Sequence, residues 1–138
     1  MVIEYGVRLI GILYLALGII GFLPVEAINP VHHEGVGATY LFNLVAINAL
    51  HNIVHLTIGI TALLSVRSSA RARLWGKVAG SVLLLLFVAG IIQAIAEDFP
   101  RDQLLLGLVP LNSPGHVLHL VSGSLAIYLG FLRLRAEE

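Results

Sequence analysis

The chain has 138 residues, of which 58% are hydrophobic and 12% are charged, and it contains no cysteine. Its eight basic and eight acidic residues cancel, so no basic field favours nucleic acid as a partner. The absence of thiols excludes disulfides, thiolate metal ligands and cysteine nucleophiles, which leaves histidine and carboxylate as candidates for any site. A mean hydropathy of +0.95 is typical of an integral membrane protein.

Charged residues divide the chain into four uncharged runs, and each run predicts one transmembrane helix. The runs cover residues 9–25, 35–66, 78–96 and 103–132. A span needs about 20 apolar residues, so the first and third runs suit one helix each. The second and fourth runs are too long for one span and too short for two. We therefore expect each of them to begin with an apolar segment at the membrane surface.

The helices of the second and fourth runs are expected to start near Asn48 and Asn112. In the fourth run, Ser113 is a candidate cap for a helix whose first position is Pro114. The predicted fold class is all-α, an integral membrane four-helix bundle.

Seven of the eight basic residues gather on one side of the predicted spans. They precede the first span, fill the loop between the second and third, and follow the fourth: Arg8, Arg67, Arg71, Arg73, Lys77, Arg133 and Arg135. By the positive-inside rule this side is cytoplasmic. The sequence thus predicts a multi-pass membrane protein with both termini in the cytoplasm and loops 24–47 and 97–112 facing out.

An internal repeat relates the two halves of the chain. The segment "LVAINALHNIVHLTIG" from Leu44 matches "LVPLNSPGHVLHLVSG" from Leu108 at a constant offset of 64 residues. We therefore expect one transmembrane domain, residues 1–138, built from two repeated helical hairpins at about 5–66 and about 76–135. Both hairpins have the same orientation, so a pseudo-two-fold axis should run along the membrane normal.

Polar residues follow one face of each repeated helix. At about 100° per residue, Asn52, His55 and Gly59 share a face and His51 lies beside it. Their counterparts in the second half are His116, His119 and Gly123. An imidazole facing lipid would leave its nitrogens unsatisfied, so we expect the two stripes to face each other as a buried seam near the outer surface.

Three interpretations of this seam compete. In the first, the asparagines cap the helix starts and the histidines form hydrogen bonds across the bundle. In the second, His55 and His119 are axial ligands of a haem, or one of them binds a chlorophyll-type pigment, and Gly59 and Gly123 make room for the macrocycle.

In the third interpretation the seam binds a transition metal such as zinc, copper or nickel, which imidazole suits as a ligand. The candidate ligands are His51, His55, His116 and His119. The His-His-Glu sequence at 32–34 is a further candidate to complete this set. Asn48, Asn52 and Asn112 are available to orient the ligands.

The segment "NALHNIVHL" at 48–56 and its partner "LNSPGHVLHL" at 111–120 resemble a family of small bacterial four-span membrane proteins grouped as a domain of unknown function. The resemblance covers nearly the whole chain and implies a four-helix membrane protein, but it supplies no activity. We predict a non-enzymatic accessory or interaction subunit that contacts lipid and other membrane subunits or self-associates. The alternative is a haem-, chlorophyll- or metal-binding protein. A transporter is least favoured, because no charged residue lies in the middle of a span.

Overall fold

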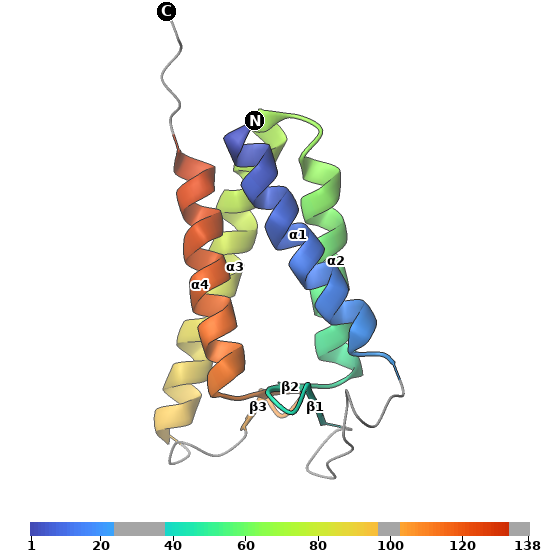
Figure 1. The fold of residues 1–138 in the computed structure, drawn as a ribbon. Helices are drawn as coiled ribbons and strands as arrows, with labels where there is room; N and C mark the ends of the chain where they lie inside the picture. The colour runs from blue at the N-terminus through green and yellow to red at the C-terminus, as the bar shows by residue number, and fades with distance from the viewer. Residues whose placement is uncertain (24–37, 97–102, 133–138) are drawn as a thin grey trace, which may run out of the picture.

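The computed structural model describes residues 1–23, 38–96 and 103–132, which form four α-helices and two short antiparallel β-hairpins (Figure 1). In chain order the elements are α1 (Val2–Ile20), β1 (Thr39–Leu41), β2 (Val45–Ile47), α2 (Ala49–Ser65), α3 (Ser69–Ala96), β3 (Gln103–Leu105), β4 (Val109–Leu111) and α4 (Ser113–Phe131). The helices run alongside one another. The β-hairpins lie together at one end, and the start of α1 and the turn between α2 and α3 lie at the other.

The two β-hairpins replace the apolar surface segments that the sequence led us to expect, so the all-α prediction is wrong for these residues. Each hairpin turns through two residues in the left-handed region: Phe42 and Asn43 in the first, with φ of 53° and 57°, and Leu106 and Gly107 in the second, with φ of 54° and 70°. Asparagine and glycine tolerate this conformation, which favours a tight turn between two short strands. Residues 24–37 and 97–102 of the predicted outer loops lie outside the described residues.

The predicted starts of the second and fourth helices are confirmed. Asn48 caps α2, because its side chain accepts a hydrogen bond from the backbone N–H of His51. Asn112 caps α4 in the same way, by accepting from the N–H of Gly115. The proposed cap at Ser113 is wrong, because the asparagine before it takes that position and Ser113 is already helical.

The helices α1 and α3 begin before the apolar runs from which they were predicted. The first turns of α1 include Glu4 and Arg8, and α3 extends through the basic segment up to Lys77. The ammonium of Lys77 lies 4.5 Å from the ring centroid of Phe131 on α4, and its Cγ lies close to Gly130 of the same helix. Charged residues at a helix end keep their charges at the surface, so they do not mark where the helix starts.

The largest helix interfaces join α1 to α2 and α3 to α4. Glycines allow this close approach. A Cβ atom added at Gly59 of α2 would lie 2.5 Å from the backbone nitrogen of Leu15 in α1. One added at Gly76 of α3 would lie 2.6 Å from the carbonyl oxygen of Ala126 in α4. Small residues at such crossings let helix backbones pack directly against each other, as in membrane bundles.

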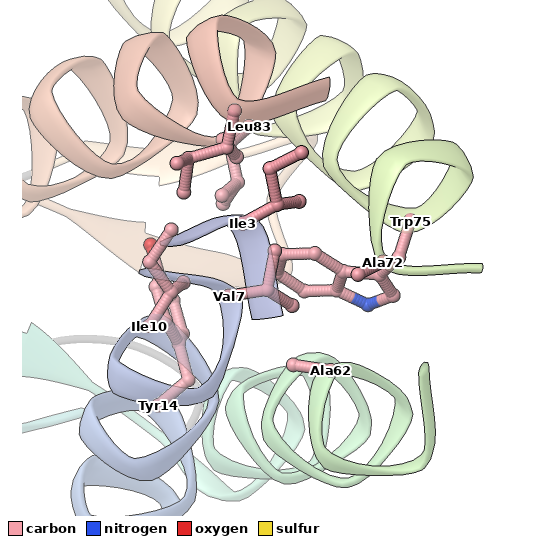
Figure 2. Close-up of a cluster of buried hydrophobic side chains, with 10 residues drawn as sticks. Ile3, Val7, Ile10, Tyr14, Ala62, Ala72, Trp75 and Leu83 are labelled. Atoms are coloured by element: carbon pink, nitrogen blue, oxygen red, sulfur yellow. The ribbon is translucent and has the colours of Figure 1, made fainter. Parts of the chain in front are cut away.

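A hydrophobic cluster fills the bundle between its middle and the end opposite the hairpins (Figure 2). One face of α1 supplies Ile3, Val7, Ile10 and Tyr14. The indole of Trp75 from α3 joins them and donates a hydrogen bond of 3.0 Å from Nε1 to the hydroxyl of Thr61 on α2. The core therefore connects both helix pairs. At the hairpin end, buried polar side chains lie beside buried hydrophobic residues of the strands, such as Leu41, Ile47 and Leu111.

Two described helices, α1 and α3, are long and apolar enough to cross a membrane, and α2 is a shorter apolar helix. In the most apolar stretches of α1 and α3, only 33% and 22% of the residues are buried. A core helix of a soluble protein would be mostly buried. One face of each helix packs in the core, and many of the other apolar side chains of α1 and α3 are exposed.

Candidate functional site

The starts of α2 and α4 are tied together at the hairpin end by two reciprocal hydrogen bonds. The side-chain amide of Asn48 donates to the carbonyl oxygen of Leu108 at 2.8 Å, and that of Asn112 donates to the carbonyl oxygen of Leu44 at 2.7 Å. Each asparagine thus caps its own helix and binds the turn of the other hairpin. These bonds fix the first turns of α2 and α4 relative to each other.

Three histidines meet beside these first turns. His51 and His55 of α2 and His119 of α4 are each buried, with exposed fractions of 2%, 1% and 3%. One ring nitrogen from each lies within 4.8 Å of the other two. The ring centroids of His51 and His55 are 4.4 Å apart, and those of His51 and His119 are 5.9 Å apart. We call these three residues the histidine cluster.

Most nitrogens of the histidine cluster have no hydrogen-bond partner among the described residues. They are Nδ1 of His51, both nitrogens of His55 and Nδ1 of His119. The ring of His51 also lies beside the backbone of Ala46 in β2 and of Pro110 in β4.

His116, the fourth candidate ligand, lies apart from the histidine cluster. Its ring faces α3, with its centroid 6.4 Å from that of Phe87 and its edge against Gly90. His116 packs against α3 whereas His119 meets His51 of α2, although the two residues lie only about 60° apart around α4. Asn52 is also turned away and packs against Gly21 at the end of α1. The 32–34 segment lies outside the described residues.

Tyr14 and Ser122 border the histidine cluster, although the sequence did not identify them as site residues. The Tyr14 ring meets His55 edge to face at a centroid distance of 5.2 Å, and its hydroxyl lies 2.7 Å from Ser122 Oγ. Ser122 donates its own hydrogen to the carbonyl oxygen of Leu118, so it accepts from Tyr14. A tyrosine within an apolar span, and a serine three residues after His119, are the signals that could have indicated them.

The Tyr14–Ser122 bond predicts unequal effects of removing its two partners. Tyr14→Phe is expected to cost about 1 kcal/mol of unfolding free energy, because Ser122 keeps its bond to Leu118. Ser122→Ala should cost about 2 kcal/mol, because it leaves the Tyr14 hydroxyl as a buried donor without a partner. Unfolding of both variants in detergent micelles measures the difference. Equal costs would contradict this assignment of donor and acceptor.

The packing does not favour a tetrapyrrole between His55 and His119. The space expected beside the two glycines is already occupied by atoms of the neighbouring helices. A Cβ at Gly59 would meet the Leu15 backbone, and one at Gly123 would lie 3.1 Å from Leu83 Cβ. The His51 ring also lies against both other rings, where a macrocycle would have to extend. A single metal ion is much smaller than a macrocycle and does not need this space.

A family model described as "Domain of unknown function (DUF4383)" matches residues 4–132. No curated protein and no solved structure matches the chain.

Proposed function

Since the chain belongs to this family of unknown function, we propose from the structure that it is a four-span integral membrane protein of the bacterial plasma membrane, acting as a non-enzymatic accessory or interaction subunit. Its lateral apolar surface contacts lipid and, in places, other membrane subunits or a second copy.

The observation that carries this proposal is the apolar side chains exposed on every helix. One large example from each of the four is Leu9, Ile53, Leu85 and Val117. Helices α1 and α4 have 19 residues each, or about 28 Å, and the 17 residues of α2 rise about 25 Å. The hydrocarbon core is about 30 Å thick. All four helices can therefore place an apolar surface against lipid acyl chains.

The repeat of two hairpins is supported by equivalent details in the two halves. The strand pair Thr39 and Ile47 corresponds to Gln103 and Leu111 at the offset of 64 residues. The left-handed turn residues and the reciprocal asparagine bonds correspond at the same offset. This agreement supports two hairpins of the same orientation related by a pseudo-two-fold axis.

The orientation is supported by the described basic residues, which lie at the end opposite the β-hairpins. They are Arg8 on α1, Arg67 after α2, and Arg71, Arg73 and Lys77 at the start of α3. The positive-inside rule places this end in the cytoplasm. The histidine cluster and the hairpins then lie toward the outer surface.

A non-enzymatic role is supported by the surroundings of the polar groups. Ser122, whose hydroxyl borders the histidine cluster, already donates to Leu118 and accepts from Tyr14. An activated serine instead donates to a base. This arrangement favours a structural or binding role over nucleophilic catalysis.

Single-cysteine labelling tests the membrane topology, because the chain has no cysteine of its own. In intact cells, Leu106→Cys at the tip of the second hairpin should react with a membrane-impermeant maleimide. Ala70→Cys at the basic end should react only after the membrane is permeabilised. Leu85 is 67% exposed in the isolated chain, so Leu85→Cys would react in a soluble fold. In the membrane we expect it to react only after denaturation.

Site-specific photo-crosslinking tests the accessory role. A photoreactive amino acid is placed at Leu9 on α1 or at Ile92 on α3, both exposed apolar positions. An interaction subunit should give a discrete protein adduct from at least one of these faces in native membranes. Adducts with lipid alone from every exposed face would contradict the accessory role.

In the cysteine-labelling test, labelling of Leu85→Cys at the rate of Leu106→Cys would contradict the membrane fold.

A further inference from the structure

We propose that His51, His55 and His119 form a three-imidazole site for one transition-metal ion, beneath the β-hairpins. The proposal is independent of the accessory role, because it concerns the chemistry of the buried end and not the lateral surface.

The spacing of the ring nitrogens suits a shared ion. One nitrogen from each histidine lies within 4.8 Å of the other two. Nitrogens bound to zinc at about 2.0 to 2.1 Å in tetrahedral geometry are roughly 3.4 Å apart. Rotation of the rings about their side-chain torsions can supply this small contraction. Three protein ligands leave a fourth position open for water or another small ligand.

A bound ion would give the unpartnered histidine nitrogens a partner. Nδ1 of His51, Nδ1 of His119 and both nitrogens of His55 are buried without a hydrogen-bond partner. Buried polar atoms in this condition are rare and costly, and several in one place point to a ligand. A metal ion would accept the lone pair of one nitrogen from each ring.

The contacts around the rings would hold them as ligands. The ring of His51 lies between the backbone of β2 and β4 on one side and the rings of His55 and His119 on the other. Metal-binding histidines are typically oriented by a hydrogen bond from the nitrogen that does not bind the metal, often to a backbone carbonyl. The edge-to-face contact with Tyr14 positions the ring of His55, and the Ser122 hydroxyl fixes Tyr14 in turn.

The ligand set indicates the class of metal. Imidazole suits zinc, copper, nickel and iron, whereas calcium and magnesium require oxygen ligands. Within the described ranges, no carboxylate belongs to the histidine cluster. Within these ranges, no negatively charged ligand therefore neutralises the ion. In an apolar surrounding, burying a monovalent ion costs less free energy than burying a divalent one. Monovalent copper is tested beside zinc for this reason.

The test is equilibrium binding to full-length protein in lipid nanodiscs, purified through a tag without histidine and stripped with chelator. Zn²⁺ alone and Cu⁺ alone are the probes. We expect saturation near one ion per chain with at least one probe. His55→Ala and His119→Ala should lose this binding. His116→Ala is the matched control, because it removes a buried histidine of α4 outside the histidine cluster, and it should retain the binding.

X-ray absorption at the metal edge of the unmodified protein keeps the proposal testable if a histidine variant fails to fold. The expected signal is three imidazole nitrogens at about 2.0 Å. The proposal is overturned if neither probe binds stoichiometrically, if His55→Ala binds as the unmodified protein does, or if the spectrum lacks three imidazole ligands.

Discussion

Gly59→Ala is expected to lower the free energy of unfolding by about 2 to 3 kcal/mol. The new Cβ would lie 2.5 Å from the backbone nitrogen and 2.8 Å from the Cα of Leu15. Both atoms belong to the backbone of α1, so no side-chain rotation can relieve the clash. The α1–α2 interface must open along its length. Chemical unfolding in mixed detergent micelles measures the loss.

Gly115→Ala is the matched control for this substitution. Its new Cβ would lie 3.4 Å from Asn112 Oδ1 and 3.9 Å from a Val45 methyl group, which are ordinary contacts. Replacing glycine with alanine also reduces the entropy of the unfolded chain, so this variant should be neutral or slightly more stable. Similar losses for both variants would show that the α1–α2 contact at Gly59 is not tight.

Asn48→Ala is expected to cost about 2 kcal/mol, because it removes two interactions at once. One is the cap on the His51 N–H, worth about 1 kcal/mol, and the other is the bond to the Leu108 carbonyl, worth a similar amount. Asn112→Ala should cost about as much. The double variant should lose the connection between the two hairpins, which thermal unfolding in nanodiscs can measure.

Asn48→Ser separates the two contributions. Serine is a good helix cap but is too short to reach the Leu108 carbonyl, so we expect this variant to recover about half of the loss. Full recovery would show that the bond between the hairpins adds no stability. No recovery would show that the cap adds none.

The sequence was informative wherever local chemistry determines structure. The helix starts followed from Asn48 and Asn112, because an asparagine before an apolar run caps a helix with its own side chain. The polar face of α2 followed from helical periodicity, and His51, Asn52, His55 and Gly59 are all buried as expected. His55 and His119 were expected to lie close together, and both belong to the histidine cluster.

The remaining features depend on contacts between distant segments, which the spacing of residues does not specify. The direction of His116 is set by the position of α3, against which its ring packs. Gly59 was expected to leave space for a cofactor, but α1 fills it. Tyr14 reaches the histidine cluster only because α1 crosses both α2 and α4. The strands of the hairpins have three residues each, too short for an alternating pattern to be recognised.

The exchange of bonds between Asn48 and Asn112 has the form of an isologous contact, in which each side offers the other the same group. Two separate identical hairpins would have to carry the same residue at every equivalent position of such a contact. A single chain removes this constraint, and the positions one turn into α2 and α4 have diverged to His51 and Gly115. The reciprocal asparagine bonds therefore keep the two halves of the chain equivalent where α2 and α4 are joined. In the adjacent turn the two halves can differ, which allows an odd number of imidazoles there.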